Sequence, residues 1–304
     1  MSVTNQTLIN FAHEARSNYR NLIPLAGQPD ALFAVKNMTL TGQNPDRQLP
    51  ARLYTPSQQP EQTSYPLVLF LHGGGWISGD LDTHDVLARA LALGLNAQVL
   101  AVQYRLAPES DGFAQVDDAL LGLTWLFEQA DSLQGNTRQI VVVGDSAGAT
   151  LAANLASRLV EDNSAIKLAA QWLMYPAVNF DFATPSMRTY GENKFPDKSF
   201  IALARQAYLP ADVAENDPRL VPYFSNHAHA VPSIVSLAGE DPLSSAAQEY
   251  AQKLIDNNIQ CECTVYPGQA HGFIQFYKDK AANPLGEKAL RDGLGLLKAW
   301  LKGL

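Results

Sequence analysis

Hydrophobic positions follow two periods along the chain, one typical of helices and one of strands. Near the N-terminus, apolar side chains from Leu8 and Phe11 to Tyr19 and Leu22 recur at steps of three and four, which predicts an amphipathic helix over 3–22. Short apolar runs without polar alternation are typical of buried strands. The pattern predicts strands over 35–41, 49–55, 66–71, 98–102, 140–143, 169–175, 233–238 and 260–266, and further helices over 84–95, 113–129, 149–159, 200–208, 246–257 and 285–301.

The order of these elements indicates one mostly parallel sheet. Strands that are separated by helices of ten or more residues need crossover connections, which make neighbouring strands parallel and place helices on both faces of the sheet. The first two strands are joined only by the turn-rich residues 42–46, which predicts an antiparallel edge. We therefore expect a single α/β domain over residues 1–304 with an eight-stranded sheet.

The pattern loosens between residues 179 and 223, where prolines flank the helical patch at 200–208. This segment follows the carboxyl end of a predicted strand, which is the edge where open α/β sheets bind their ligands. It is also longer than an ordinary loop. We expect it to form a helical cap over that edge together with the N-terminal segment, about residues 1–30.

The clearest chemical signal is Gly144-Asp-Ser-Ala-Gly148, which lies between a predicted strand and a predicted helix. Glycines two residues either side of a serine let a strand and a helix close around a strained turn that presents the hydroxyl. The helix N-terminus behind the serine offers backbone N–H groups that favour negative charge. Ser146 is therefore the candidate nucleophile, and the alternative is a buried serine in a glycine-rich turn.

A serine nucleophile needs a base to take its proton and an acid to orient that base. Among six histidines, His271 lies in a glycine-flanked loop after the last predicted strand, whereas His72 opens a glycine run and is better placed to fix that loop. We interpret the others as structural, and these are His13, His84, His227 and His229. Asp241 follows the preceding strand, with Glu240 as its local alternative. The order Ser146, Asp241, His271 is the one expected for α/β hydrolases.

Acyl transfer also needs hydrogen-bond donors that stabilise a tetrahedral oxyanion. This stabilisation is usually the largest single contribution to the rate enhancement. The N–H of Ala147, directly after the candidate nucleophile, is one such donor. The run His72-Gly-Gly-Gly75 predicts others, because residues without side chains let backbone N–H groups approach a ligand. A phosphate-binding loop would need a following Lys-Ser/Thr, but Trp76-Ile77 stands there, and the dinucleotide fingerprint G-x-G-x-x-G is not found either.

Five motifs carry a family resemblance. They are His72-Gly-Gly-Gly75, Tyr104-Arg-Leu-Ala-Pro-Glu109, Gly144-Asp-Ser-Ala-Gly148, Asp241-Pro-Leu243 and His271-Gly-Phe273. From about residue 35 to the C-terminus the chain resembles the hormone-sensitive-lipase-like family of α/β hydrolases, and residues 79–85 and 266–268 are similar to its bacterial acetyl esterases.

The resemblance implies an α/β-hydrolase fold and cleavage of short-acyl esters without a metal or cofactor. It implies a catalytic triad and three oxyanion donors, which are Ser146, Asp241 and His271, and Gly74, Gly75 and Ala147. The chain departs from the family pattern at Gln103, at residues 110–113, and after Asp241-Pro-Leu, where Ser245 replaces a second acidic residue. None of these departures removes a catalytic group, but the last leaves open what supports the Asp241 loop.

Charge and composition limit the classes of partner that the protein can bind. The net charge is −8 and the basic residues do not cluster, which argues against nucleic acid or an anionic membrane surface as a partner. The first residues lack the basic and apolar regions of a signal peptide, so we expect a cytoplasmic location. The predicted edge strand at 260–266 would permit a homodimer.

Three functions are consistent with these residues. The first is a serine carboxylesterase for short-chain acyl esters, acetyl to butyryl, acting through an acyl-enzyme intermediate. The second is a binding or regulatory protein on a hydrolase scaffold, and the third is a deacetylase of sugars or other small acetylated metabolites. Plant hormone receptors of this family lose the histidine, so the presence of His271 with Ser146 and Asp241 favours an enzyme. The fold alone does not identify the ester.

Overall fold

The computed structural model describes residues 4–43, 46–61 and 63–304. Within them, eight strands form one sheet in the order β1-β2-β4-β3-β5-β6-β7-β8. The strands are β1 Ala34–Gln43, β2 Asp46–Thr55, β3 Tyr65–Leu71, β4 Gln98–Val102, β5 Gly135–Asp145, β6 Ala170–Met174, β7 Ser233–Ala238 and β8 Cys261–Tyr266. All neighbours from β4 to β8 are parallel, whereas β2 is antiparallel to both β1 and β4. The expected parallel sheet with an antiparallel edge is confirmed.

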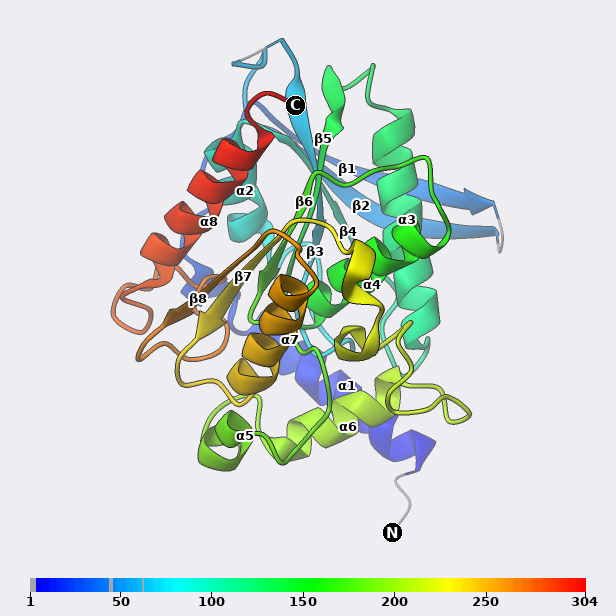
Figure 1. The fold of residues 1–304 in the computed structure, drawn as a ribbon, viewed down its shortest axis with the longest axis vertical. Helices are drawn as coiled ribbons and strands as arrows, with labels where there is room; N and C mark the ends of the chain where they lie inside the picture. The colour runs from blue at the N-terminus through cyan, green and yellow to red at the C-terminus, as the bar shows by residue number, and fades with distance from the viewer. Residues whose placement is uncertain (1–3, 44–45, 62) are drawn as a thin grey trace.

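Helices cover both faces of this sheet (Figure 1). The helices are α1 Asn5–Arg20, α2 Asp85–Leu95, α3 Gly112–Glu128, α4 Ala147–Glu161, α5 Pro185–Tyr190, α6 Lys198–Tyr208, α7 Ser244–Asp256 and α8 Gly286–Leu301, with short 3₁₀ turns at Ile23–Ala26, Pro222–Phe224 and His227–His229. One face carries α2 and α8, and the other carries α3, α4 and α7. The layers are those of an α/β hydrolase.

The central strands are buried on both faces, which explains why they read as continuous apolar runs. On β3, Leu67, Leu69 and Leu71 pack in the layer of α3 and α4, while Val68 and Phe70 between them pack in the layer of α2 and α8. Successive side chains of a strand point to opposite faces, so a strand covered by helices on both sides needs apolar residues at every position. The two hydrophobic cores therefore lie on either side of one sheet.

Two local features did not follow from the sequence. The N-cap of helix α2 is His84, whose side chain makes no capping hydrogen bond. The hydroxyl of the preceding Thr83 donates to the carbonyl of Asp80. Helix α5 was not predicted, because six residues are too few to show a helical period.

Helices α1 and α6 lie together over the edge of the sheet where the parallel strands end (Figure 1). Phe11 of α1 and Phe200 of α6 meet edge to face, with ring centroids 5.4 Å apart. Arg16 anchors α1 by donating to the carbonyls of Ile77 and Ala107 and to the Glu109 carboxylate. The N-terminal helix is thereby held against loops that follow β3 and β4.

The outer edge of the sheet is formed by β8, which pairs only with β7 among the described residues. The homodimer expected through this edge stays a prediction. Among the helices in the described part of the chain, none is both long and apolar enough to cross a membrane.

A pair of glycines on α8 gives a test of the packing in the core. A Cβ added to Gly293 would lie 2.0 Å from the fully buried indole of Trp172, whereas a Cβ added to the exposed Gly295 would meet no atom within 4 Å. We expect Gly293→Ala to lower the free energy of unfolding by about 1–3 kcal/mol through overpacking. Gly295→Ala should raise it by about 0.5–1 kcal/mol, because alanine favours the helix.

Urea unfolding of the two variants beside the wild type measures both effects. If the two substitutions changed stability in the same direction, the packing of α8 against β6 described here would be contradicted.

Candidate active site

Ser146 occupies the sharp turn between β5 and α4. Its backbone has φ +52° and ψ −120°, a combination that a non-glycine residue adopts only under constraint. The flanking glycines allow this turn because backbone atoms crowd both of them. A Cβ on Gly144 would lie 2.4 Å from the carbonyl of Gly148, and a Cβ on Gly148 would lie 2.0 Å from the carbonyl oxygen of Leu71. The G-x-S-x-G spacing is therefore a packing requirement here.

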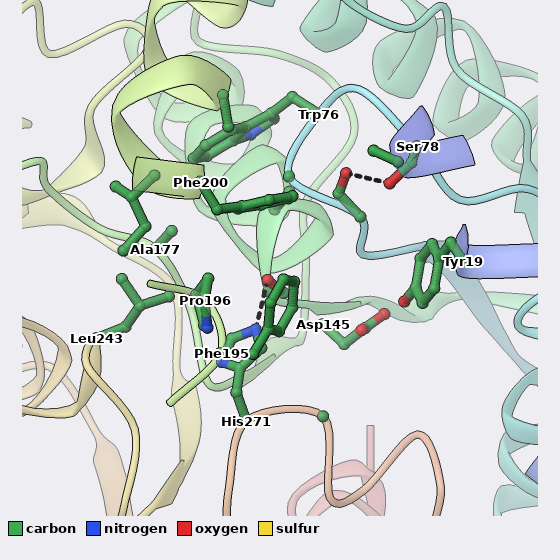
Figure 2. Close-up of a pocket in the computed structure, with 18 of the residues that line it drawn as sticks. Tyr19, Trp76, Ser78, Asp145, Ala177, Phe195, Pro196, Phe200, Leu243 and His271 are labelled. Carbon is green, nitrogen blue, oxygen red and sulfur yellow. Dashed lines mark hydrogen bonds between the residues drawn. The ribbon is translucent and has the colours of Figure 1, made fainter. Parts of the chain in front are cut away.

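The structure brings Ser146, His271 and Asp241 together in one hydrogen-bonded chain. His271 Nε2 lies 2.8 Å from Ser146 Oγ, a bond that is drawn as a dashed line from His271 in Figure 2. His271 Nδ1 lies 2.6 Å from Asp241 Oδ2. Asp241 is fully buried and its second oxygen accepts from the N–H of Leu243. Because a carboxylate can only accept, Nδ1 carries the proton and Nε2 is left to accept the proton of the serine hydroxyl. This arrangement can activate a serine.

The local alternative, Glu240, points elsewhere. Its carboxylate pairs with the Lys194 ammonium at 2.7 Å, and both side chains are more than a third exposed. It is therefore Asp241 and not Glu240 that contacts His271.

A paired serine contact supports the Asp241 loop where the family has an acidic residue. The N–H of Ser186 donates to Ser245 Oγ and the N–H of Ser245 donates to Ser186 Oγ, each at 3.0 Å. The Ser186 hydroxyl also donates to the carbonyl of Pro242 at 2.7 Å. Helix α5, which the sequence did not reveal, thus holds this loop in place.

Backbone donors converge beside Ser146. Gly74, Gly75 and Ala147 line the same cavity as the serine, and both glycines have positive φ, +129° and +61°. Ala147 is the first residue of α4, so its N–H has no acceptor within the helix. Among the residues that the structure describes, the N–H groups of these three residues donate to no other backbone or side-chain group. They are available to an oxygen bound at the serine.

A cavity of about 550 Å³ lies above these groups, between the sheet edge and helices α1 and α6. Part of its wall is apolar and comes from Trp76, Ala177, Phe180, Ile201, Ala204 and Leu243. In this wall Trp76 stacks on the buried ring of Tyr208 at 4.5 Å and meets Phe180 edge to face at 5.7 Å. Polar groups of Tyr19, Ser78 and Asp145 lie elsewhere on the lining (Figure 2).

The sequence missed several residues that surround this site. Phe195 and Phe200 lie in the loosely patterned segment, and Phe195 stands at the mouth of the cavity with its ring 6.2 Å from that of His271. His84, which the sequence analysis interprets as structural, has its ring buried beside Asp145, a contact that the sequence did not reveal. Neither position follows a local pattern, because each depends on contacts across the fold. No group of three or more His, Cys, Asp or Glu side chains in the described ranges is arranged to hold a metal ion.

Comparisons with known proteins identify the family of this chain. Residues 68–275 match a protein family described by its alpha/beta hydrolase fold. The chain is 33% identical over 266 residues to ethyl acetate hydrolase from Pseudomonas putida, covering 87% of this chain and 83% of that protein. The chain belongs to the hormone-sensitive-lipase-like family of α/β hydrolases.

Other members of the family agree in activity and shape. The chain is 32% identical over 287 residues to carboxylic ester hydrolase LipN from Mycobacterium tuberculosis, covering 92% of this chain and 75% of that protein. A thermophilic carboxylesterase cloned from a metagenomic library superposes with a TM-score of 0.87 at 27% identity, covering 99% of this chain and all of the other. This member of the hormone-sensitive-lipase-like family is thus a carboxylic ester hydrolase.

The histidine that opens the glycine run makes the stability of this hydrolase depend on pH. Burial lowers the pKa of His72 to about 4, with the neighbouring His84 as a second cause. Between pH 4 and the unfolded value of about 6.5, the unfolded chain binds more protons, so the free energy of unfolding rises with pH. We expect it to fall by about 2 kcal/mol from pH 7 to pH 5 on account of His72.

Urea unfolding at pH 7, 6 and 5 measures this change in a range above the titration of most carboxyl groups. The lowered pKa of His227, caused mainly by burial, acts in the same direction. A free energy of unfolding that stayed constant from pH 7 to pH 5 would contradict a buried, neutral His72.

Proposed function

We propose that this chain is a serine carboxylesterase that hydrolyses short-chain esters, acetyl to butyryl, through an acyl-enzyme intermediate. The observation that carries the proposal is the hydrogen-bonded chain from Ser146 through His271 to the buried Asp241, which lies beside free backbone N–H groups. The same groups in the same roles catalyse acyl transfer on several unrelated folds.

The reaction proceeds in two halves. Ser146 Oγ attacks the carbonyl carbon of the ester while His271 Nε2 takes the hydroxyl proton, and Asp241 stabilises the imidazolium. The tetrahedral oxyanion accepts hydrogen bonds from the N–H groups of Gly74, Gly75 and Ala147. His271 then gives the proton to the departing alkoxide, which leaves as an alcohol. A water, deprotonated by His271, then attacks the acyl-enzyme, and His271 returns that proton to Ser146 Oγ as the bond to the acyl carbon breaks and the acid leaves.

The apolar wall of the cavity supports a short acyl group. The buried rings of Trp76, Tyr208 and Phe180 pack together in this wall, so an acyl chain that extended through it would have to displace buried aromatic side chains. The relative from Pseudomonas putida is named for hydrolysis of ethyl acetate, an ester with a two-carbon acyl group. Both observations favour acetyl to butyryl esters over fatty-acyl esters.

We also propose that one domain spans residues 1–304 and that about residues 1–30 and 179–223 act as its cap. The contact between Phe11 and Phe200 supports this, since it joins α1 and α6 above the serine. A cap of this kind excludes bulk water, which strengthens the electrostatic interactions in the site. The free edge of β8 supports a homodimer as a further part of the proposal.

The acyl-length profile of the wild type and of Ser146→Ala tests the proposed function. We expect hydrolysis of p-nitrophenyl esters to peak between acetate and butyrate and to decline toward palmitate. Ser146→Ala should lower kcat by at least about 10⁴-fold, since loss of a nucleophile removes the whole covalent route. Hydrolysis rates at pH 7.5 across the series provide the measurement.

Ser132→Ala is the matched control, because Ser132 is exposed and, among the residues that the structure describes, bonds only the backbone and side chain of Gln129. It should keep the wild-type profile. Activity that survived Ser146→Ala would overturn the assignment of the nucleophile, and a peak at palmitate would overturn the short-chain proposal. Acetylated sugars in the same series distinguish a sugar deacetylase.

A further inference from the structure

A buried histidine behind the site has no step in the proposed mechanism. His84 Nε2 lies 3.3 Å from Asp145 Oδ1 and 3.4 Å from Asp145 Oδ2, and both side chains are 2% exposed. Asp145 immediately precedes Ser146, and its Oδ1 accepts the N–H of Gly73 at 2.8 Å. Gly73 in turn immediately precedes Gly74. His84 therefore contacts the one carboxylate that joins the serine turn to the glycine loop.

The neighbours of His84 Nε2 place a proton on that nitrogen. The carbonyl of Thr83 accepts from Gln275 Nε2, so Gln275 Oε1 is the atom that accepts the Tyr19 hydroxyl at 2.8 Å. The hydroxyl proton of Tyr19 is therefore used in the bond to Gln275. The Tyr19 oxygen lies 3.2 Å from His84 Nε2 and can only accept a hydrogen bond from that nitrogen. His84 Nε2 is accordingly protonated and donates toward Tyr19 and Asp145.

The Asp145 carboxylate needs this donor. It is buried, and a buried charge without hydrogen-bond partners is costly. Together with burial, which is the larger cause, the charge of Asp145 raises the pKa of Tyr19, Tyr104 and Tyr175. The donors that face the carboxylate are the N–H of Gly73 and His84 Nε2. Without His84, the carboxylate would lose one of them and could turn away from Gly73.

The glycine loop leaves little room for such a rotation of the Asp145 carboxylate. A Cβ on Gly73 would lie 2.4 Å from Asp145 Oδ2, so the loop and the carboxylate are in close contact. The carbonyl of Gly74 is fixed from the other side by the N–H and the hydroxyl of Ser78. Ser78 thus holds the peptide group between Gly74 and Gly75, so movement of the carboxylate would rotate the peptide group between Gly73 and Gly74, whose N–H faces the serine.

We propose that His84 is a positioning residue. It holds Asp145 so that the carboxylate keeps the backbone N–H groups of the Gly73–Gly75 loop directed at the oxyanion. Tyr19 links the same histidine to helix α1, so that docking of the N-terminal helix and the geometry of the glycine loop are coupled. This inference rests on the proposed function, because the loop matters only if an oxyanion forms. A displacement of about 1 Å in such donors can cost about 100-fold in rate.

Two amide substitutions separate positioning from packing. The amide of His84→Gln reaches the place of Nε2 and can donate to Asp145, whereas the shorter amide of His84→Asn reaches only the place of Nδ1, beside Thr83. We expect His84→Asn to lower kcat for p-nitrophenyl acetate by about 10- to 100-fold with KM within about threefold of the wild type. His84→Gln should keep kcat within about fivefold of the wild type.

Inhibition by butylboronic acid adds a readout that general destabilisation would not change. Boron forms a tetrahedral adduct with a serine hydroxyl, and one of its oxygens takes the place of the oxyanion. We expect the inhibition constant to rise in His84→Asn by the same factor by which kcat falls, and to stay near the wild-type value in His84→Gln. Rates are normalised to the folded fraction, measured by circular dichroism.

His227→Asn is the matched control, because His227 is also buried but packs against Tyr250 outside the cavity. It should leave kcat and the inhibition constant unchanged. Equal kcat in His84→Asn and the wild type, or equal losses in the Asn and Gln variants, would overturn the proposal. Failure of the proposed function is distinct from either result, because Ser146→Ala would then retain hydrolysis.

Discussion

The close approach of two strand ends underlies the whole site. Strands β3 and β5 are parallel neighbours and end at the same edge, so the glycine loop after β3 meets the serine turn after β5. The contact is so tight that Gly148 lies against the carbonyl of Leu71 and Gly73 lies against the Asp145 carboxylate. One hydrogen bond, from Gly73 N–H to Asp145, joins the loop that carries the candidate oxyanion donors to the turn that carries the candidate nucleophile.

The remaining groups reach the site through the same parallel order. Asp241 follows β7 and His271 follows β8, which are adjacent strands at the far end of the sheet. Their loops therefore meet beside the serine turn, where the two side chains bond each other and Ser146. Helices α1 and α6 close the space above, and α5 braces the Asp241 loop through the paired serines. The loops at the edge of the sheet carry the candidate catalytic residues, and the helices enclose the cavity above them.

The sequence predicts what depends on local periods and spacing. The buried strands, the mostly parallel sheet with its antiparallel edge and the turn at Ser146 follow from apolar runs and glycine positions, and Asp241 and His271 follow from their places after strands. The sequence does not predict what depends on contacts across the fold. Ser186 and His84 belong to this second group, because each acquires its partner only when segments about sixty residues apart pack together. The short helix α5 is missed because it shows no period.

Covalent labelling of Ser146 tests the central claim most directly. The protein is incubated with an alkyl fluorophosphonate, digested, and analysed by peptide mass spectrometry, beside the variant His271→Ala. The account predicts one adduct per chain, on the peptide that carries Ser146, formed far more slowly in His271→Ala because the hydroxyl then lacks its base. An adduct on another residue, or full ester hydrolysis by protein that is never labelled at Ser146, would contradict it.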